Sequence, residues 1–140
     1  ATVVVKTTQG NITILLYPKN APASVSNFLD LCISDFYDDK IFHRVVPNFV
    51  IQTGCPRGDG YGGMDYTIPS EVDDMKYDDE GYVGMASAGL HTEGSQFFIT
   101  HSPTPHLDGR YTIFGKVITG MDVVHKIEVG DKIIDAILTK

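Results

Sequence analysis

The chain has no tryptophan, only two cysteines and no long hydrophobic run among its 140 residues. No apolar stretch approaches the roughly 18 residues that a membrane-spanning helix needs, which argues against an integral membrane protein. Cys32 and Cys55 do not form a C-x-x-C motif, and two free thiols in a reducing compartment are expected, with a disulfide as the open alternative. Because no basic and apolar leader opens the chain, a cytoplasmic location is expected as well.

Basic residues are also scarce, with 11 Lys and Arg against 18 Asp and Glu and a net charge of -7. Binding to a polyanion requires clustered Lys and Arg, so a nucleic-acid partner is not expected. The apolar fraction of 42% and the charged fraction of 21% are those of an ordinary globular protein. We therefore expect a single domain over residues 1–140, present as a monomer and without a membrane partner.

Hydrophobic periodicity predicts many short strands and two helices. Apolar residues alternate before and after Gln9 and Gly10, as in a β-hairpin, and they recur at helical spacing from Val25 to Phe36 after a proline entry. Further strands are predicted at residues 42–52, 84–85, 97–100, 111–117 and 133–138, with a short helix after Gly120. Strands and helices do not alternate, so the pattern indicates a closed antiparallel sheet with helices packed at its ends.

Three motifs that could indicate other chemistry lack the context they need. Gly58, Gly60 and Gly63 match G-x-G-x-x-G, but no strand-to-helix unit surrounds them, so a nucleotide site is not expected. The five histidines are scattered without metal-ligand spacing, and no metal site is expected. Ser87 lies in an incomplete G-x-S-x-G motif, which does not indicate a hydrolase.

Residues 42–52, FHRVVPNFVIQ, place Arg44 in an apolar, strand-like segment that should be largely buried. A buried arginine is either held in a structural ion pair or directed at a ligand carbonyl, and spacing alone does not separate the two. Residues 84–101, GMASAGLHTEGSQFFITH, supply a second half to the site. The candidate cluster offers no nucleophile and no base, which is typical of a binding pocket: Arg44, Phe49, Val50, Gln52, Gln96, Phe98 and Leu107.

The blocks FHRVVPNFVIQTG, GMASAGLHTEGSQFFIT and LDGRYTIFGKV resemble, in order, the signature blocks of cyclophilins, the peptidyl-prolyl cis-trans isomerases. The likeness runs through nearly the whole chain. It implies a mainly β fold, an eight-stranded closed antiparallel β-barrel capped by two α-helices, with the substrate groove on the outer face of the barrel. It also implies an isomerase of X-Pro bonds that assists protein folding, acts on proline-containing peptides and partly folded proteins, and needs no cofactor.

Carried over by the resemblance, Arg44 is the catalytic residue and Gln52 orients it or the substrate. The remaining positions bind substrate: Phe49, Val50, Phe98 and Leu107 form the proline pocket, Gln96 lines the groove, Ala86, Ser87 and Ala88 pair with the peptide backbone, and His106 and Tyr111 lie at the rim.

Several of these positions depart from the family pattern. Cyclophilins commonly carry Met at Val50, Asn at Ser87 and, in many members, His at Tyr111, and drug-sensitive members carry Trp at His106. Weak cyclosporin binding is therefore expected. The alternative function is a proline-peptide binding module with little turnover, which the presence of Arg44 and Gln52 disfavours.

Overall fold

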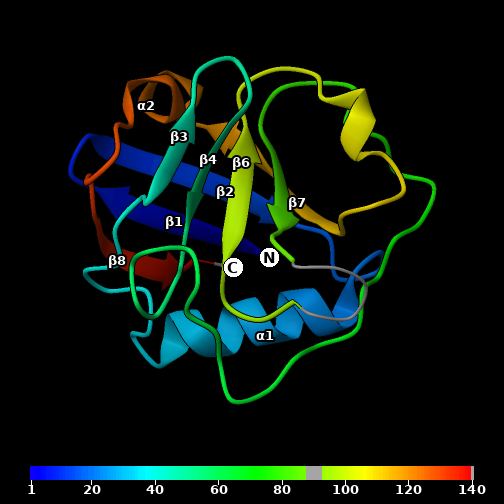
Figure 1. Cartoon of the computed structure of the whole chain (residues 1–140), viewed down its shortest axis with the longest axis horizontal. Coiled ribbons are helices and arrows are strands. Elements are labelled where there is room, and N and C mark those ends of the chain that lie inside the picture. The colour runs from blue at the N-terminus through cyan, green and yellow to red at the C-terminus, as the bar shows by residue number, and fades with distance from the viewer. Residues whose placement is uncertain (88–92, 140) are drawn as a thin grey trace.

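The computed structural model describes residues 1–87 and 93–139, and these form one curled antiparallel sheet with two α-helices (Figure 1). The strand order is β3-β4-β6-β5-β7-β2-β1-β8. The strands are β1 (Thr2–Thr7), β2 (Gly10–Leu16), β3 (Arg44–Val46), β4 (Val50–Thr53), β5 (Tyr82–Met85), β6 (Phe97–Thr100), β7 (Ile113–Thr119) and β8 (Ile133–Leu138). The helices are α1 (Pro22–Ile33), α2 (Met121–Lys126) and the single 3₁₀ turn η1 (Pro105–Leu107). The predicted mainly β fold with two helices is confirmed.

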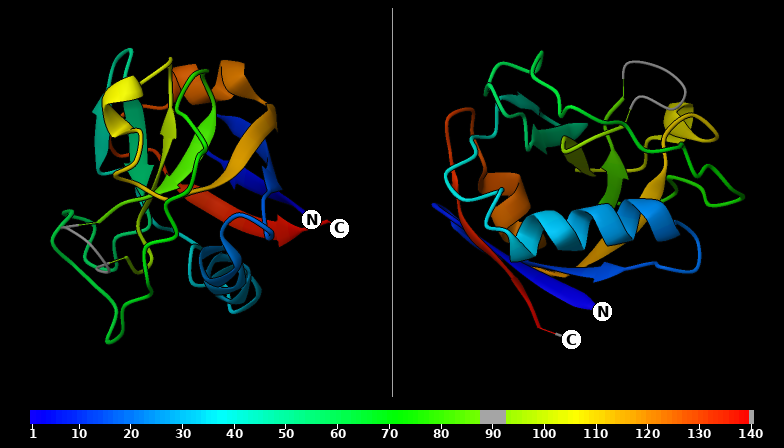
Figure 2. Two further views of the ribbon diagram at one scale, coloured as in Figure 1. Left: turned by 90° about the vertical axis from the view of Figure 1, so that its right-hand side faces the viewer. Right: turned by 90° about the horizontal axis from the view of Figure 1, so that it is seen from below.

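The predicted N-terminal hairpin is β1 paired with β2, and its turn follows Thr7. Val3 and Val5 of β1 and Ile12 and Ile14 of β2 are fully or almost fully buried, whereas the residues between them are more exposed. The alternation thus puts one face of the hairpin into the core. On the other side of β1 lies β8, and the backbone N–H of Thr139 donates to the carbonyl of Thr2 at 2.9 Å. The two ends of the chain therefore lie side by side (Figure 2).

The two α-helices cover opposite ends of the curled sheet (Figures 1 and 2). Pro22 lies in the first turn of α1, where its missing N–H costs nothing, and the Glu71 carboxylate accepts the free N–H groups of Ala23 and Ser24 at 2.9 and 2.7 Å. The helix ends at Ile33, earlier than the hydrophobic pattern predicts, because the chain turns at Asp35 with a positive φ of 61°. None of the helices in the described part of the chain is long and apolar enough to cross a membrane.

The barrel is closed less regularly than predicted. Strands β3 and β8 stand at the two ends of the sheet order and are not joined by a ladder of hydrogen bonds. Instead, the segment before β3 bridges the gap: Ile41 pairs with Lys132, the Phe42 N–H donates to the Asp131 carbonyl at 2.8 Å, and the Ile133 N–H donates to the Lys40 carbonyl at 2.9 Å. The sheet is a curled half-barrel whose seam is a short irregular segment.

The hydrophobic side chains form two clusters on opposite faces of β4 and β6. Ile51, Phe97 and Ile99 point into the main core with α1, while Val50 and Phe98 belong to a smaller cluster on the outer face. This is the period-two arrangement that the sequence predicts for these strands. The outer cluster, which carries Val50, Tyr77, Phe98, Leu107 and Ile113, is where the candidate site lies.

Candidate active site

The site is organised around one row of residues that crosses four strands. Arg44 of β3 pairs with Gln52 of β4, Gln52 pairs with Phe98 of β6, and Phe98 pairs with Gly84 of β5. Directly opposed residues on neighbouring strands place their side chains on the same face of the sheet. The cation, the amide and the aromatic ring are therefore adjacent on the outer face because of strand register alone.

Arg44 is exposed, so the prediction that it is largely buried is wrong. The β3 strand lies at the end of the sheet order and carries no further layer over its outer face, which leaves the side chain in the open groove. Its guanidinium lies 5.7 Å from the centre of the Phe49 ring, within cation–π range. In the described part of the chain Arg44 has no carboxylate partner, so the structural ion-pair interpretation finds no support there.

Next to Arg44 is a hollow of about 320 Å³. Its lining brings together most of the predicted site: Arg44, Phe49, Val50, Gln52, Ala86, Ser87, Phe98, Leu107 and Tyr111. Phe49 joins this set because the chain reverses at the groove in a turn over residues 46–49. The Phe49 N–H donates to the Val46 carbonyl at 3.0 Å, and Asn48 adopts a positive φ. Among these residues there is no histidine or carboxylate that could activate Ser87 or Tyr111 as a nucleophile.

Tyr77 and Gly84 support the pocket from behind, and sequence reasoning missed both. Tyr77 is buried, its ring stacks on Phe98 with centroids 5.9 Å apart, and its hydroxyl donates to the Tyr111 carbonyl at 3.1 Å. Burial, aided by the charge of Asp108, raises the pKa of Tyr77 well above its ordinary value, so the phenol stays a donor. At Gly84 any Cβ would lie 2.4 Å from the Phe98 ring, so only glycine leaves room for it. The sequence did offer one signal for Tyr77: an aromatic residue within the acidic stretch 71–80 is a candidate for burial.

The amides of the site form a chain that leads away from Arg44. Gln52 Nε2 donates to Gln96 Oε1 at 3.0 Å, and Gln96 Nε2 donates to the carbonyls of Gly60 and Gly62 at 3.2 and 3.0 Å. Gln96 also lines a second hollow of about 310 Å³, which shares Gln52, Ala86 and Ser87 with the first. Together the two hollows make one extended groove. The glycine-rich loop forms its far wall, and no helix follows it within residues 64–87 or 93–104, so these ranges lack the strand-to-helix context of a dinucleotide loop.

The other predicted substrate-binding residues fall at the edges of the groove. Ala86 and Ser87 follow β5 and line both hollows, and Ala88 lies outside the described residues. His106 is exposed on η1 and does not line the pocket, but its ring centre lies 5.2 Å from that of Phe49. The roles of all these residues in binding stay predictions.

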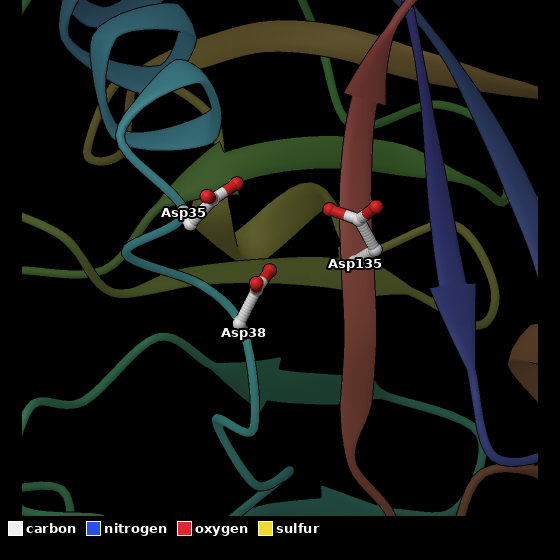
Figure 3. Close-up of side chains that lie close together, drawn as sticks. All are labelled: Asp35, Asp38 and Asp135. Atoms are coloured by element: carbon white, nitrogen blue, oxygen red, sulfur yellow. The ribbon is translucent and has the colours of Figure 1, made fainter.

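Cys32 and Cys55 are both buried free thiols, which answers the disulfide alternative. Away from the groove, the carboxylates of Asp35, Asp38 and Asp135 point toward one another between the end of α1 and β8, with their oxygens within 4.8 Å (Figure 3). Burial, followed by the charges of Asp35, Asp135 and Asp39, raises the pKa of Asp38. The sequence could not indicate this acidic cluster, because Asp135 is brought to the other two only by the pairing of β8 in the sheet.

A model of the cyclophilin type peptidyl-prolyl cis-trans isomerase family matches residues 2–137. The chain therefore belongs to the cyclophilin-type peptidyl-prolyl cis-trans isomerases, a family of isomerases, and the resemblance of the three sequence blocks is confirmed.

Three relatives illustrate the similarity. Peptidyl-prolyl cis-trans isomerase B of Bacillus subtilis is 50% identical over 117 residues, which is 83% of this chain and 82% of the relative. Peptidyl-prolyl cis-trans isomerase 9 of Schizosaccharomyces pombe is 47% identical over 132 residues, covering 91% of this chain but 22% of the relative. This chain thus spans about a fifth of the length of that larger protein. A crystal structure of a Cryptosporidium parvum cyclophilin type isomerase, determined in the presence of the dipeptide Ala-Pro, has 35% identity and a TM-score of 0.93 over 100% of this chain and 99% of that one.

Proposed function

We propose that this chain catalyses cis-trans isomerisation of X-Pro peptide bonds in exposed segments of other proteins. The observation that carries the proposal is the exposed Arg44 guanidinium beside a pocket with apolar walls, together with the family to which the chain belongs. An X-Pro bond resists rotation by about 18 to 20 kcal/mol because of amide resonance, while its two isomers differ by only about 0.5 to 1 kcal/mol. The reaction therefore requires a lower barrier and no bond cleavage, which agrees with a lining that offers no activated nucleophile among the described residues.

The arrangement of residues supports a non-covalent mechanism. As the bond twists, resonance is lost and the prolyl nitrogen becomes pyramidal and basic, so a hydrogen bond from Arg44 to that nitrogen or the nearby carbonyl strengthens in the transition state. Phe98, Phe49 and Leu107 would hold the proline ring still while the acyl side turns. Gln52, directly opposite Arg44 in the strand register, would orient the guanidinium or the substrate carbonyl.

The peptide would lie along both hollows in an extended conformation. Ala86 and Ser87 line the two hollows and follow the end of β5, where a peptide backbone could pair as an added strand. Such a site recognises a proline and the residues beside it rather than one folded partner, which suits assistance of protein folding. The Ala-Pro dipeptide used with the Cryptosporidium structure is a ligand of the same class.

The competing function is a proline-peptide binding module with little turnover. A protease-coupled assay on a short Ala-Pro peptide separates the two functions. The isomerase predicts a large acceleration of cis-to-trans conversion that saturates with peptide. The module predicts binding, seen as peptide-induced shifts in an NMR spectrum, without added exchange between the isomers. Binding without acceleration would replace the proposal with the binding module, and the absence of both binding and acceleration would overturn it.

A further inference from the structure

Cys55 occupies the start of the glycine-rich loop, directly after β4 and Gly54. The residue is 1% exposed, and its Sγ accepts hydrogen bonds from the backbone N–H groups of Gly60 and Gly62, both at 3.3 Å. These two hydrogen bonds hold Gly60 and Gly62 against Cys55, the residue at which the loop begins. The thiol thus accepts two hydrogen bonds from the loop, and its S–H lies within reach of Asp59 Oδ1 at 3.8 Å and of the Gly62 carbonyl at 3.9 Å. The mechanism proposed above makes no use of it.

The same two glycines hold Gln96. While their N–H groups donate to Cys55, their carbonyls accept both hydrogens of the Gln96 amide nitrogen, at 3.2 and 3.0 Å. With its nitrogen committed to the loop, Gln96 must turn its Oε1 to Gln52, which donates to it at 3.0 Å. The loop thereby fixes the direction of the hydrogen-bond chain, and the Oε1 of Gln52 is left without a partner among residues 1–87 and 93–139.

We propose that Cys55 is a positioning residue for the groove: by holding Gly60 and Gly62 it fixes Gln96, and through Gln96 it orients Gln52 beside Arg44. The inference rests on the proposed isomerase function. Its chemical requirement is specific, because position 55 must present an acceptor able to receive two N–H donors at once. A sulfur meets it, a carboxylate would meet it, and a methyl group cannot.

The two cysteines of the chain differ in the direction of their pKa shifts, and only the Cys55 thiol is held by backbone N–H donors that favour its ionised form. Burial alone would raise the pKa of the Cys55 thiol, but backbone hydrogen bonds from Gly62, Arg57, Gly60 and Asp59 together lower it below its ordinary value. Cys32, buried in the core next to Asp135, has its pKa raised to about 12. Ionisation of Cys55 would strengthen both N–H bonds, since a charged acceptor forms the stronger hydrogen bond.

Other charged groups lie around the loop. The Asp59 carboxylate is 3.8 Å from the sulfur and is paired with Arg57 at 2.9 Å, and His43 lies beneath Gly60. Desolvation and the neighbouring Arg44 lower the pKa of His43. All three residues are retained in every variant at Cys55, and because the contact with Asp59 changes with the thiol, such variants test the sulfur together with that contact.

The test compares Cys55→Ala and Cys55→Asp with the unmodified chain, and Cys32→Ala serves as the matched cysteine control. We expect Cys55→Ala to lower kcat/KM about tenfold, on the scale of a slight misplacement of an orienting group, and Cys55→Asp to restore it. As pH rises through the lowered pKa of Cys55, kcat/KM of the unmodified chain should rise together with the ultraviolet absorbance of the thiolate, whereas Cys55→Asp should show no such rise. Equal activity of Cys55→Ala and the unmodified chain would overturn the proposal, as would failure of aspartate to rescue.

A further readout separates this inference from the proposed function. The side-chain amide resonances of Gln96 and Gln52 should shift in Cys55→Ala and return in Cys55→Asp, whether or not the protein turns over a substrate. If the unmodified chain is inactive but these resonances respond, the isomerase function fails and the hydrogen-bond chain stands. If Cys55→Ala does not fold, the pH profiles of Cys55→Asp and the unmodified chain decide, and parallel profiles contradict the role of the thiol.

Discussion

The groove at Arg44 and the acidic cluster at Asp38 both hold charge without an ion-pair partner among the described residues, and they differ in sign and setting. Arg44 stands alone at the groove, with an aromatic ring beside it and no carboxylate partner in the ranges 1–87 and 93–139. At the acidic cluster, Asp35, Asp38 and Asp135 bring their oxygens within 4.8 Å of one another, and Asp38 Oδ1 is buried without a hydrogen-bond partner.

The difference lies in what each group can do about its charge. A guanidinium does not lose its proton at any pH that a folded protein meets, so Arg44 keeps its positive charge and can only use it on something that enters the groove. A carboxylate can take up a proton when its charge is unfavourable. Burial and the neighbouring carboxylates raise the pKa of Asp38 and so favour its protonated form. Charge at the groove is therefore permanent, whereas charge at the acidic cluster varies with pH.

Removing the permanent charge should have the largest effect. For Arg44→Ala we expect kcat/KM for an Ala-Pro peptide to fall about a hundredfold or more, on the order of 2.7 to 4 kcal/mol, because one transition-state donor is lost. Thermal unfolding should be nearly unchanged, since the side chain is exposed and has no ion-pair partner in the described residues. Lys6→Ala, which removes an exposed cation from β1, is the control. A melting temperature far below that of the control would mean that Arg44 is structural.

The row of opposed residues that begins at Arg44 ends at Gly84, and a substitution there should disturb the pocket. Gly84→Ala would place a Cβ 2.4 Å from the Phe98 ring and 2.5 Å from the Tyr77 hydroxyl, and overpacking of this kind costs about 1 to 3 kcal/mol. We expect a lower free energy of unfolding and a weaker isomerase, because Phe98 must move. Gly63→Ala, where nothing lies within 4 Å of the added Cβ, should unfold like the unmodified protein. Equal unfolding of the two variants would show that Phe98 repacks freely.

A smaller effect is expected at the rim, where His106 lies beside Phe49. By the family resemblance, cyclosporin-sensitive members carry tryptophan here, and imidazole offers less area for packing on an apolar ligand. His106→Trp should increase cyclosporin affinity about five- to thirtyfold, or about 1 to 2 kcal/mol, and leave turnover of small peptides similar. Calorimetric titration at neutral pH measures the difference. Nanomolar binding by the unmodified chain, or no gain with tryptophan, would contradict the predicted place of His106.

The smallest effect is predicted at the acidic cluster. Because the pKa of Asp38 is higher in the folded than in the unfolded chain, the free energy of unfolding falls as pH rises through that raised pKa. Asp38→Asn should remove this fall and stabilise the protein by about 0.5 kcal/mol at neutral pH, with no gain in acid.

Urea unfolding at several pH values measures the gain, and Asp74→Asn, an exposed aspartate outside the cluster, is the control. Isomerase activity should not change. A saturable stabilisation of the unmodified protein by Ca²⁺ that Asp38→Asn loses would contradict the view that burial and the neighbouring carboxylates make the Asp38 charge unfavourable.

Sequence reasoning predicted what depends on periodicity and on local turn chemistry. The hairpin around Gly10, the helix entered at Pro22 and the last strand, Ile133–Leu138, are confirmed, as is the alternation that separates Phe98 from Phe97. Arg44 was placed correctly in a strand but wrongly in the interior. Apolar neighbours in the sequence indicate a strand, but burial of its outer face depends on whether another layer covers it.

What the sequence could not predict depends on contacts between distant segments. Tyr77 lies in a stretch without regular structure, and only the packing of that stretch against Phe98 and Tyr111 makes it the support of the pocket. The bonds from the Cys55 loop to Gln96 join residues that are 34 and 36 positions apart. The irregular seam near Ile41 likewise follows from how far the sheet curls. None of these contacts produces a repeating pattern along the chain.

The adjacency of Thr2 and Thr139 has a consequence for how this domain can be rearranged. Their backbones are joined by a 2.9 Å hydrogen bond across the β1 and β8 pair, so the polypeptide enters and leaves the fold at one point. A few linking residues could close the chain into a circle, and new ends could then be opened at an exposed loop away from the groove. The same geometry would let the whole domain be spliced into a surface loop of an unrelated host without pulling the host's own chain apart.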